Sequence, residues 1–328
     1  MTKDEKYMQY CLELASRGKL WVAPNPMVGA ALVDNEGNIA GSGWHQQYGS
    51  AHAEVNAFKD FHLRYGADAT AEDLTLYVSL EPCSHFGKTP PCADLIIREG
   101  VKHVVVGSLD PNPLVSGNGV RKLKEADVDV HIGVLEEQCR YLNRRFICLY
   151  EKKRPYVILK WAQTADGFIA PRNQSERFVI STPQTKRIVH QMRAENMAIM
   201  VGTNTALLDN PKLTVTHAEG RNPIRILLDR HNRVPRNYNI FSDEAETIVY
   251  SDDTDWHYIL SDLAQRGIHS VLVEGGAALL NHIIGTDIYD EVHVEINPNI
   301  HLYDGIAAPK IAIEGTPEIV DGNLLYSF

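Results

Sequence analysis

Clustered positive charge is absent from this chain. Its formal net charge is −10 at pH 7 over 328 residues, and the densest basic stretch is only residues 151–154. Because a nucleic-acid surface needs grouped lysine and arginine side chains to contact the phosphates, we expect no nucleic-acid partner. The pattern favours a small-molecule substrate and leaves room for a basic pocket that binds one phosphate.

Long apolar runs and a disulfide framework are also missing. No stretch approaches about 20 consecutive apolar residues, the length that crosses a bilayer, and residues 1–5 are polar, unlike a secretory signal. The five cysteines are odd in number and are not spaced as a disulfide framework. We therefore expect no membrane partner, a cytoplasmic protein, and buried structural roles for Cys11, Cys139 and Cys148.

Neither of two common nucleotide-binding fingerprints occurs. The sequence contains no G-x-G-x-x-G and no G-x-x-x-x-G-K-[ST], which excludes a Rossmann dinucleotide motif and a P-loop. A nucleotide cofactor would therefore have to bind to a different fold.

The length and the order of the elements indicate two domains. A chain of 328 residues exceeds one typical small domain, and a hydrophobic fraction of 44% suffices for two cores. Charge density rises at residues 151–154, and Pro155 precedes a new strand-like run, so we expect domains at 1–150 and 151–328. Both halves alternate helical and strand patterns, which predicts mixed α/β domains with helices packed on sheets.

The chain does contain one strong chemical pattern, formed by His52, Glu54, Cys83 and Cys92. One imidazole and two thiolates supply three ligands of a tetrahedral zinc site and leave the fourth position for water. Zinc lowers the pKa of that water to about 7, and a carboxylate two residues from the histidine can move protons to a leaving amine. This is the chemistry of hydrolytic deamination of an aminopyrimidine or a purine.

The spacing of the two thiols is unusual. The general deaminase signature P-C-x-x-C has two residues between the cysteines, whereas eight separate Cys83 from Cys92. His85 lies in this insert and could compete as a ligand. The alternatives are two structural thiols beside a surface histidine, or a metal-binding interaction module, which would give Glu54 no role.

Local patterns place these groups at the ends of regular elements. Residues 51–58 have the pattern of a helix start, and residues 75–80 that of a buried strand. Pro82 suits the first turn of a helix. Cys83 is therefore expected at a strand-to-helix turn, where free N–H groups and the helix dipole favour a thiolate.

The segment EPCSHFGKTPPC at 81–92 closely resembles the bifunctional riboflavin-biosynthesis deaminase–reductase family, as do PNPMVG at 24–29, HAEV at 52–55 and DPNP at 110–113. The resemblance covers nearly the whole chain and implies a cytidine-deaminase-like α/β/α domain followed by a dihydrofolate-reductase-like α/β domain. It implies that His52, Cys83 and Cys92 bind Zn²⁺ and that Glu54 is the catalytic proton shuttle. The residues that would line the substrate pocket are Asn25, His45, Lys88, Asp110 and Asn112.

Two segments stand out in the second half. An apolar strand pattern runs into Gly275-Gly276 and then a helix, so that backbone N–H groups could approach an anion; a plain tight turn is the alternative. Residues 201–211 are rich in small polar groups that hydrogen-bond a ribose or an amide, although an ordinary Asn/Pro loop has the same composition.

These segments, with residues 161–167, resemble the reductase half of the same family, which uses NADPH without a Rossmann domain. The resemblance implies that NADPH contacts Ala162, Thr205, Asp209, Gly276, Ala277, Ala278, Leu279, Leu280, Asn281 and His282. It also implies that the substrate faces Lys160, Arg193, Leu213 and Glu274.

Two positions depart from the pattern of that family. Many members carry Ser-x-Trp-Ile-Thr before the long helix, where residues 178–182 read FVIST, a segment that contains Val179 and lacks the tryptophan. Many also carry Leu-Thr-x-Arg, where Thr216 replaces the arginine. Loss of a charge-assisted contact with a substrate phosphate would weaken binding by roughly 1.5–3 kcal/mol, and Arg193 or Arg221 could compensate.

We therefore predict a two-step enzyme of riboflavin biosynthesis that requires Zn²⁺ and NADPH. The first step is hydrolytic deamination of a 2,5-diamino-6-ribosylamino-pyrimidinone 5′-phosphate, and the second is reduction of the ribosyl group to ribityl. The alternative is a deaminase whose second domain has lost reduction, which the two departures would favour. Net charge and the long insert disfavour a nucleic-acid base deaminase. We also expect a homo-oligomer, and the residues alone do not distinguish NADPH from NADH.

Overall fold

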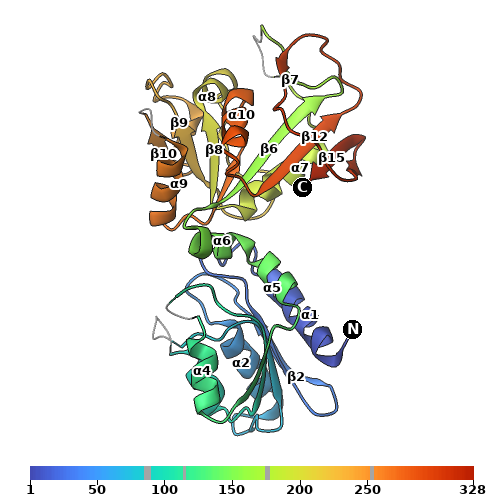
Figure 1. The fold of residues 1–328 in the computed structure, drawn as a ribbon, viewed down its shortest axis with the longest axis vertical. Helices are drawn as coiled ribbons and strands as arrows, with labels where there is room; N and C mark the ends of the chain where they lie inside the picture. Colours follow the sequence, from blue (N-terminus) through green and yellow to red (C-terminus); the bar gives the residue numbers. More distant parts are fainter. Residues whose placement is uncertain (85–89, 114–115, 174–177, 252–254) are drawn as a thin grey trace. The chain divides into compact units, whose positions relative to one another are not determined.

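The chain folds into two compact units, residues 1–152 and 153–328 (Figure 1). The computed structural model describes residues 1–84, 90–113, 116–173, 178–251 and 255–328. The boundary expected at residue 150 lies in the last turn of helix α6 (Arg144–Lys152), from which the chain runs directly into strand β6 (Tyr156–Thr164). In the part that the structure describes, no helix is both long and apolar enough to span a bilayer.

A five-stranded sheet forms the centre of the N-terminal unit. The strand order is β2-β1-β3-β4-β5; β1 is antiparallel to both of its neighbours, whereas β3, β4 and β5 are parallel. The elements are α1 (Lys3–Ser16), β1 (Gly29–Val33), β2 (Ile39–Trp44), α2 (Ala53–Tyr65), β3 (Thr75–Leu80), α3 (Cys92–Arg98), β4 (His103–Ser108), α4 (Asn118–Glu125), β5 (Asp129–Ile132), α5 (Glu136–Leu142) and α6.

Helices cover both faces of this sheet. Neighbouring residues of a strand point to opposite faces. Leu76 of β3 therefore packs in the core that contains Phe58 of α2, while Tyr77 packs with Met8 of α1 and Cys139 of α5. The α/β/α arrangement expected for this unit is confirmed.

An eight-stranded sheet forms the centre of the C-terminal unit, in the order β10-β9-β8-β11-β6-β12-β15-β14. The first six strands in this order are parallel, and β15 and β14 are antiparallel additions at one edge. The elements are β6, β7 (Phe168–Ala170), α7 (Pro183–Glu195), β8 (Ala198–Gly202), α8 (Thr203–Asp209), β9 (Ile224–Leu228), the 3₁₀ helix η1 (Asn239–Phe241), β10 (Thr247–Tyr250), α9 (Trp256–Gln265), β11 (Ser270–Val273), α10 (Ala277–Thr286), β12 (Glu291–Asn297), β13 (Ile306–Ala307), β14 (Glu318–Val320) and β15 (Asn323–Ser327).

This unit has a core on each face of its sheet. Leu260 of α9 and Ile283 of α10 pack with Val271 of β11 in the larger core. Ile199 of β8 packs with Ala206 of α8 in the smaller one. Two α/β domains, each with its own core, were predicted, and this fold class is confirmed.

Helix α8 lies in a segment whose composition also fits a loop. Burial of the Ala206 side chain and a hydrogen bond from Thr203 Oγ1 to the Leu228 carbonyl (2.9 Å) anchor the helix on the sheet. The helix ends where Asn210 adopts the left-handed conformation (φ 40°) and Pro211 follows. Tertiary contacts therefore decide the structure of a segment whose helix propensity is weak.

Candidate functional sites

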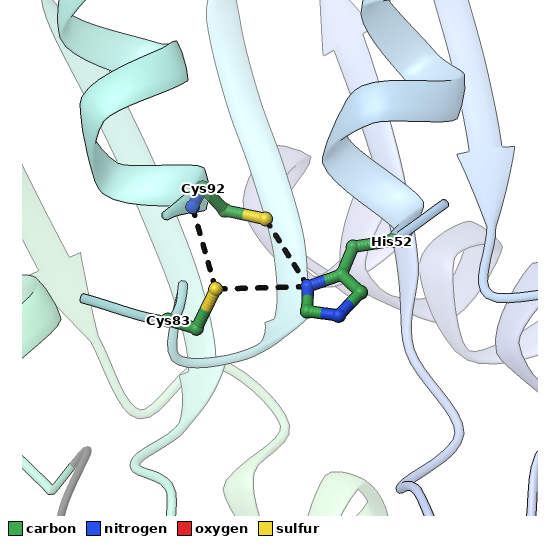
Figure 2. A group of neighbouring side chains, drawn as sticks. All are labelled: His52, Cys83 and Cys92. Carbon is green, nitrogen blue, oxygen red and sulfur yellow. Dashed lines mark hydrogen bonds between the residues drawn. The ribbon is translucent and has the colours of Figure 1, made fainter. Parts of the chain in front are cut away.

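Three potential metal ligands point toward one another in the N-terminal unit (Figure 2). His52 immediately precedes α2, Cys83 follows β3, and Cys92 begins α3. Nδ1 of His52 lies 3.6 Å from Sγ of Cys83 and 3.3 Å from Sγ of Cys92. A zinc ion with Zn–S of about 2.3 Å and Zn–N of about 2.0 Å separates its ligand atoms by roughly 3.5 Å, so these side chains fit zinc.

The environment of Cys83 favours a thiolate. The backbone N–H of Cys92 donates to its Sγ at 3.3 Å. The Cys92 side chain and His52, both hydrogen-bonded to the Cys83 thiol, lower its pKa to about 4 despite burial. The expectation that a helix begins at Pro82 is wrong, because no helix forms at residues 81–84 and the N–H that faces Cys83 belongs to the start of α3. His85 lies outside the described residues.

Glu54 lies beside these ligands in the first turn of α2. Its side chain is 3% exposed, and burial, together with the nearby Cys83 thiolate, raises the pKa of its carboxyl group. A carboxyl group with a raised pKa takes up a proton more readily near neutral pH, which suits a group that both accepts and donates protons.

A cavity of about 200 Å³ opens over His52, Glu54 and Cys83. Its lining includes four of the five residues expected to contact the substrate of this unit, namely Asn25, His45, Asp110 and Asn112. The fifth, Lys88, lies outside the described residues. Phe146 and Tyr150 of α6 also line the cavity. Their i,i+4 spacing places them on one face of a helix, but nothing else in the sequence indicates that they belong to a site.

Hydrogen bonds hold His45 in one tautomer. Its Nε2 lies 3.1 Å from the Asn25 amide nitrogen, which is only a donor, and its Nδ1 lies 3.0 Å from the Ala51 carbonyl, which is only an acceptor. The ring therefore accepts at Nε2 and donates at Nδ1. Burial lowers the pKa of His45, which favours this neutral form.

Glu81 joins the metal-ligand segment to the opposite wall of the cavity. Its carboxylate is 4% exposed and accepts hydrogen bonds from four backbone N–H groups, those of Asp110 (3.3 Å), Gly117 (2.9 Å), Gly119 (3.0 Å) and Val120 (3.2 Å). The carboxylate thus serves as an N-terminal cap for α4 that comes from a distant segment. Nothing in the local sequence around Glu81 indicates this role.

A cavity of about 710 Å³ lies in the C-terminal unit at the carboxyl ends of parallel strands, where open α/β sheets bind ligands. Its lining includes residues 202–205 at the end of β8, residues 230, 231 and 233 after β9, and residues 274–279 after β11. Of the residues expected to contact NADPH, eight are in the lining: Ala162, Thr205, Asp209, Gly276, Ala277, Ala278, Leu279 and His282.

The other two residues of that set point elsewhere. Leu280 is fully buried in the core, and Asn281 Oδ1 accepts a hydrogen bond from the Lys310 N–H at 3.0 Å. The structure instead adds Arg230, His231 and Arg233 to the lining. They follow β9, and their sequence context did not distinguish them from ordinary surface residues.

A second cavity of about 540 Å³ adjoins the first, and the two share Lys160 and Glu274. All four residues expected to face the substrate of this unit, Lys160, Arg193, Leu213 and Glu274, line it, as do Val179 and Thr216. The structure thus brings the two predicted sets into adjoining cavities. Arg221, considered as a replacement for the missing arginine, is not in the lining.

Arg193 and Glu274 form a bidentate ion pair at 2.8 and 2.6 Å. Burial would raise the pKa of Glu274, but the Arg193 guanidinium outweighs it and holds this pKa below its usual range. The carboxylate is therefore ionised at the junction of the cavities. Lys160 lies there too, with its Nζ 3.6 Å from Oε2 of Glu295. The Glu295 carboxylate accepts a hydrogen bond from Ser181 at Oε2 and from Thr185 and Asn323 at Oε1.

Two protein-family models match this chain. One describes the zinc-binding region of cytidine and deoxycytidylate deaminases and matches residues 1–108. The other describes the RibD C-terminal domain and matches residues 155–301.

Curated relatives match over nearly the full length. Riboflavin biosynthesis protein RibD of Aquifex aeolicus is 39% identical over 337 residues, which cover 96% of this chain and 92% of that protein. RibD of Escherichia coli is 34% identical and covers 91% of this chain and 88% of that protein.

Solved structures agree. A diaminohydroxyphosphoribosylaminopyrimidine deaminase/5-amino-6-(5-phosphoribosylamino)uracil reductase of Thermotoga maritima superposes with a TM-score of 0.88 at 36% identity, covering 99% of this chain and 98% of that one. RibD of Acinetobacter baumannii superposes with a TM-score of 0.89 at 30% identity over the same shares of the two chains.

Proposed function

Because this chain belongs to the RibD family of riboflavin-biosynthesis enzymes, we propose that its N-terminal unit performs a deamination and its C-terminal unit a reduction. The protein is a bifunctional zinc-dependent deaminase and NADPH-dependent reductase. A deaminase with a silent second domain is not favoured, since the reductase family model matches 155–301. The observation that carries the proposal is the convergence of His52, Cys83 and Cys92 beside the buried Glu54.

We assign the deamination to the cavity over Glu54. Zn²⁺ held by His52, Cys83 and Cys92 would supply a Lewis acid that lowers the pKa of a water molecule. The Glu54 carboxylate accepts a proton from the attacking water and gives it to the ring nitrogen. It then carries the remaining hydroxyl proton to the departing amine. Water thereby replaces the amino group by a carbonyl oxygen and ammonia leaves. His45, Asn25, Asp110 and Asn112 surround the pyrimidine.

We assign the reduction to the two adjoining cavities of the C-terminal unit. NADPH would supply a hydride for the ribosyl carbon that bears the amine. The bond from this carbon to the ring oxygen breaks, and the oxygen takes up a proton from solvent, which gives the open ribityl chain. The 710 Å³ cavity would hold NADPH and the 540 Å³ cavity the substrate, so that the reaction takes place at their shared wall. Lys160 and Glu274 at that wall orient the sugar, and positioning of the two reactants accounts for much of the rate.

A coupled assay tests both assignments. Protein loaded with zinc is expected to release ammonia from the diaminopyrimidine ribosylamino phosphate and to oxidise NADPH in the same reaction. After chelation of the metal, ammonia release is expected to stop, whereas NADPH oxidation with the deaminated intermediate continues. Ammonia release without NADPH oxidation would leave only the deaminase, and if neither signal appeared, the substrate would be wrong.

The cofactor's 2′-phosphate gives a second test of this unit. We propose that Arg230 and Arg233, which line the NADPH cavity, recognise this phosphate. Replacing both by alanine is expected to raise the KM for NADPH by about tenfold or more, since a charge-assisted contact contributes about 1.5–3 kcal/mol, and to leave the KM for NADH nearly unchanged. Initial-rate measurements give both KM values. Equal increases in the KM for NADPH and the KM for NADH would refute this assignment.

We further propose the domain boundary near residue 150, a cytoplasmic location and a homo-oligomeric state. All five cysteines are free thiols in this structure, which fits a reducing compartment. The subunit number is accessible to size-exclusion chromatography with light scattering.

A further inference from the structure

Charge is segregated along the 540 Å³ cavity. Within the described part of the chain, the carboxylates that line it are Asp209 and Glu274, and both belong to the wall shared with the NADPH cavity. Of the residues that the structure describes, those that are ionisable and line only the 540 Å³ cavity are all basic: Lys186, His190, Arg193, Lys212 and His217. The part of this cavity away from the cofactor is therefore suited to an anion.

Two of these five side chains already have carboxylate partners. Arg193 forms the bidentate pair with Glu274, and the Lys212 ammonium lies 2.6 Å from Oε1 of Glu244. The remaining three are Lys186, His190 and His217. Lys186 and His190 are four residues apart on α7 and hence share a helix face, and the rings of His190 and His217 meet edge to face with centroids 4.7 Å apart.

The backbone determines which nitrogen of His190 can donate. The N–H of Thr216 donates to Nδ1 of His190 at 3.0 Å. Burial, with the nearby Arg193 and His217, lowers the pKa of His190 to about 4, so the ring is neutral at pH 7. A neutral imidazole that accepts at Nδ1 carries its proton at Nε2, which leaves an N–H donor for a ligand.

We propose that Lys186, His190 and His217 form the subsite for the substrate's 5′-phosphate in this chain. The inference rests on the proposed function, because the reacting ribosyl carbon must lie at the wall shared with NADPH. The phosphate is attached at the other end of the ribosyl group and reaches the basic part of the cavity. These side chains take the role of an arginine at position 216, where Thr216 offers no charge.

The decisive comparison uses two forms of the reductase substrate, the 5′-phosphate and the free riboside. In the full-length protein, Lys186→Met is expected to raise the KM for the phosphate ester by about tenfold to hundredfold and to change the KM for the riboside less than about twofold. His217→Gln should act in the same direction with a smaller factor. Arg187→Met is the matched control, because it removes an exposed basic side chain of the same helix α7 that lines neither cavity.

A binding measurement without catalysis separates this inference from the proposed function. With NADP⁺ present at saturating concentration, titration calorimetry should show that inorganic phosphate binds more weakly to Lys186→Met than to the wild type or to Arg187→Met. Equal phosphate affinity in all three, or an equal loss of kcat/KM for ester and riboside in Lys186→Met, would overturn the subsite. If phosphate binding depends on Lys186 but the wild type oxidises no NADPH with either substrate, the proposed reduction is refuted and the anion site is still supported.

Discussion

Glu54→Gln is expected to slow ammonia release by about 10²–10⁴-fold, the usual contribution of a positioned general acid–base group. An amide cannot carry the proton from water to the leaving amine. Because Glu54 is buried and burial raises the pKa of its carboxyl group, a neutral amide of the same shape should not destabilise the unit. Zinc content by mass spectrometry of the metal, and NADPH oxidation with the deaminated intermediate, should both equal those of the wild type.

The matched control is Glu13→Gln, which changes an exposed carboxylate of helix α1 in the same unit. It should leave all three measurements unchanged. Wild-type ammonia release by the Glu54→Gln protein would show that another group moves the proton. Loss of zinc from that protein would show instead that Glu54 supports the metal site.

Glu81→Gln is expected to lower the free energy of unfolding of the N-terminal unit by roughly 2–6 kcal/mol. The amide keeps one acceptor oxygen and turns its NH₂ group toward two of the four backbone N–H groups that Glu81 now satisfies. Each buried donor left without an acceptor costs about 1–3 kcal/mol. Few small rearrangements can relieve this, because a Cβ on Gly119 would lie 2.0 Å from the Pro82 carbonyl oxygen.

Urea unfolding measures this effect in each unit separately, if ammonia release is used to monitor the N-terminal unit and NADPH oxidation the C-terminal unit. Deamination should be lost at a lower urea concentration than in the wild type, with reduction lost at an unchanged one, since the two units have separate cores. At low urea, the KM for deamination should rise, because the Asp110 segment loses its anchor. Glu125→Gln on the exposed surface of α4 is the control, and equal midpoints for Glu81→Gln and the wild type would refute the structural role.

The order of helices and strands could largely be read from hydrophobic periodicity. Strand β3 and helix α10 begin where the pattern placed them, because a buried strand and an amphipathic helix each require a particular spacing of apolar residues. The pattern was less informative for α8, whose small polar residues become helical only through contacts with the sheet. Within α10, the hydrophobic pattern did not distinguish the two neighbouring leucines: Leu279 lines a cavity, whereas Leu280 is in the core.

The proposed zinc ligands and Glu54 could be found from sequence because their chemistry requires those residue types. The geometry now brings His52, Cys83 and Cys92 within 4.8 Å of one another. The role of Glu81 could not be found this way, since a carboxylate that caps a helix 36 to 39 residues away has no local signature.

The sequence by itself determined the two α/β domains, the metal-binding residue types and the absence of a Rossmann fingerprint, because composition, periodicity and motif spacing are local properties. Only the tertiary structure decided which charges meet. Arg193 pairs with Glu274 across 81 residues of sequence, and His190 meets His217 through a loop that returns to α7. Parallel strands require long crossovers, so the walls of each cavity come from segments far apart in the chain, and their partners become visible only after folding.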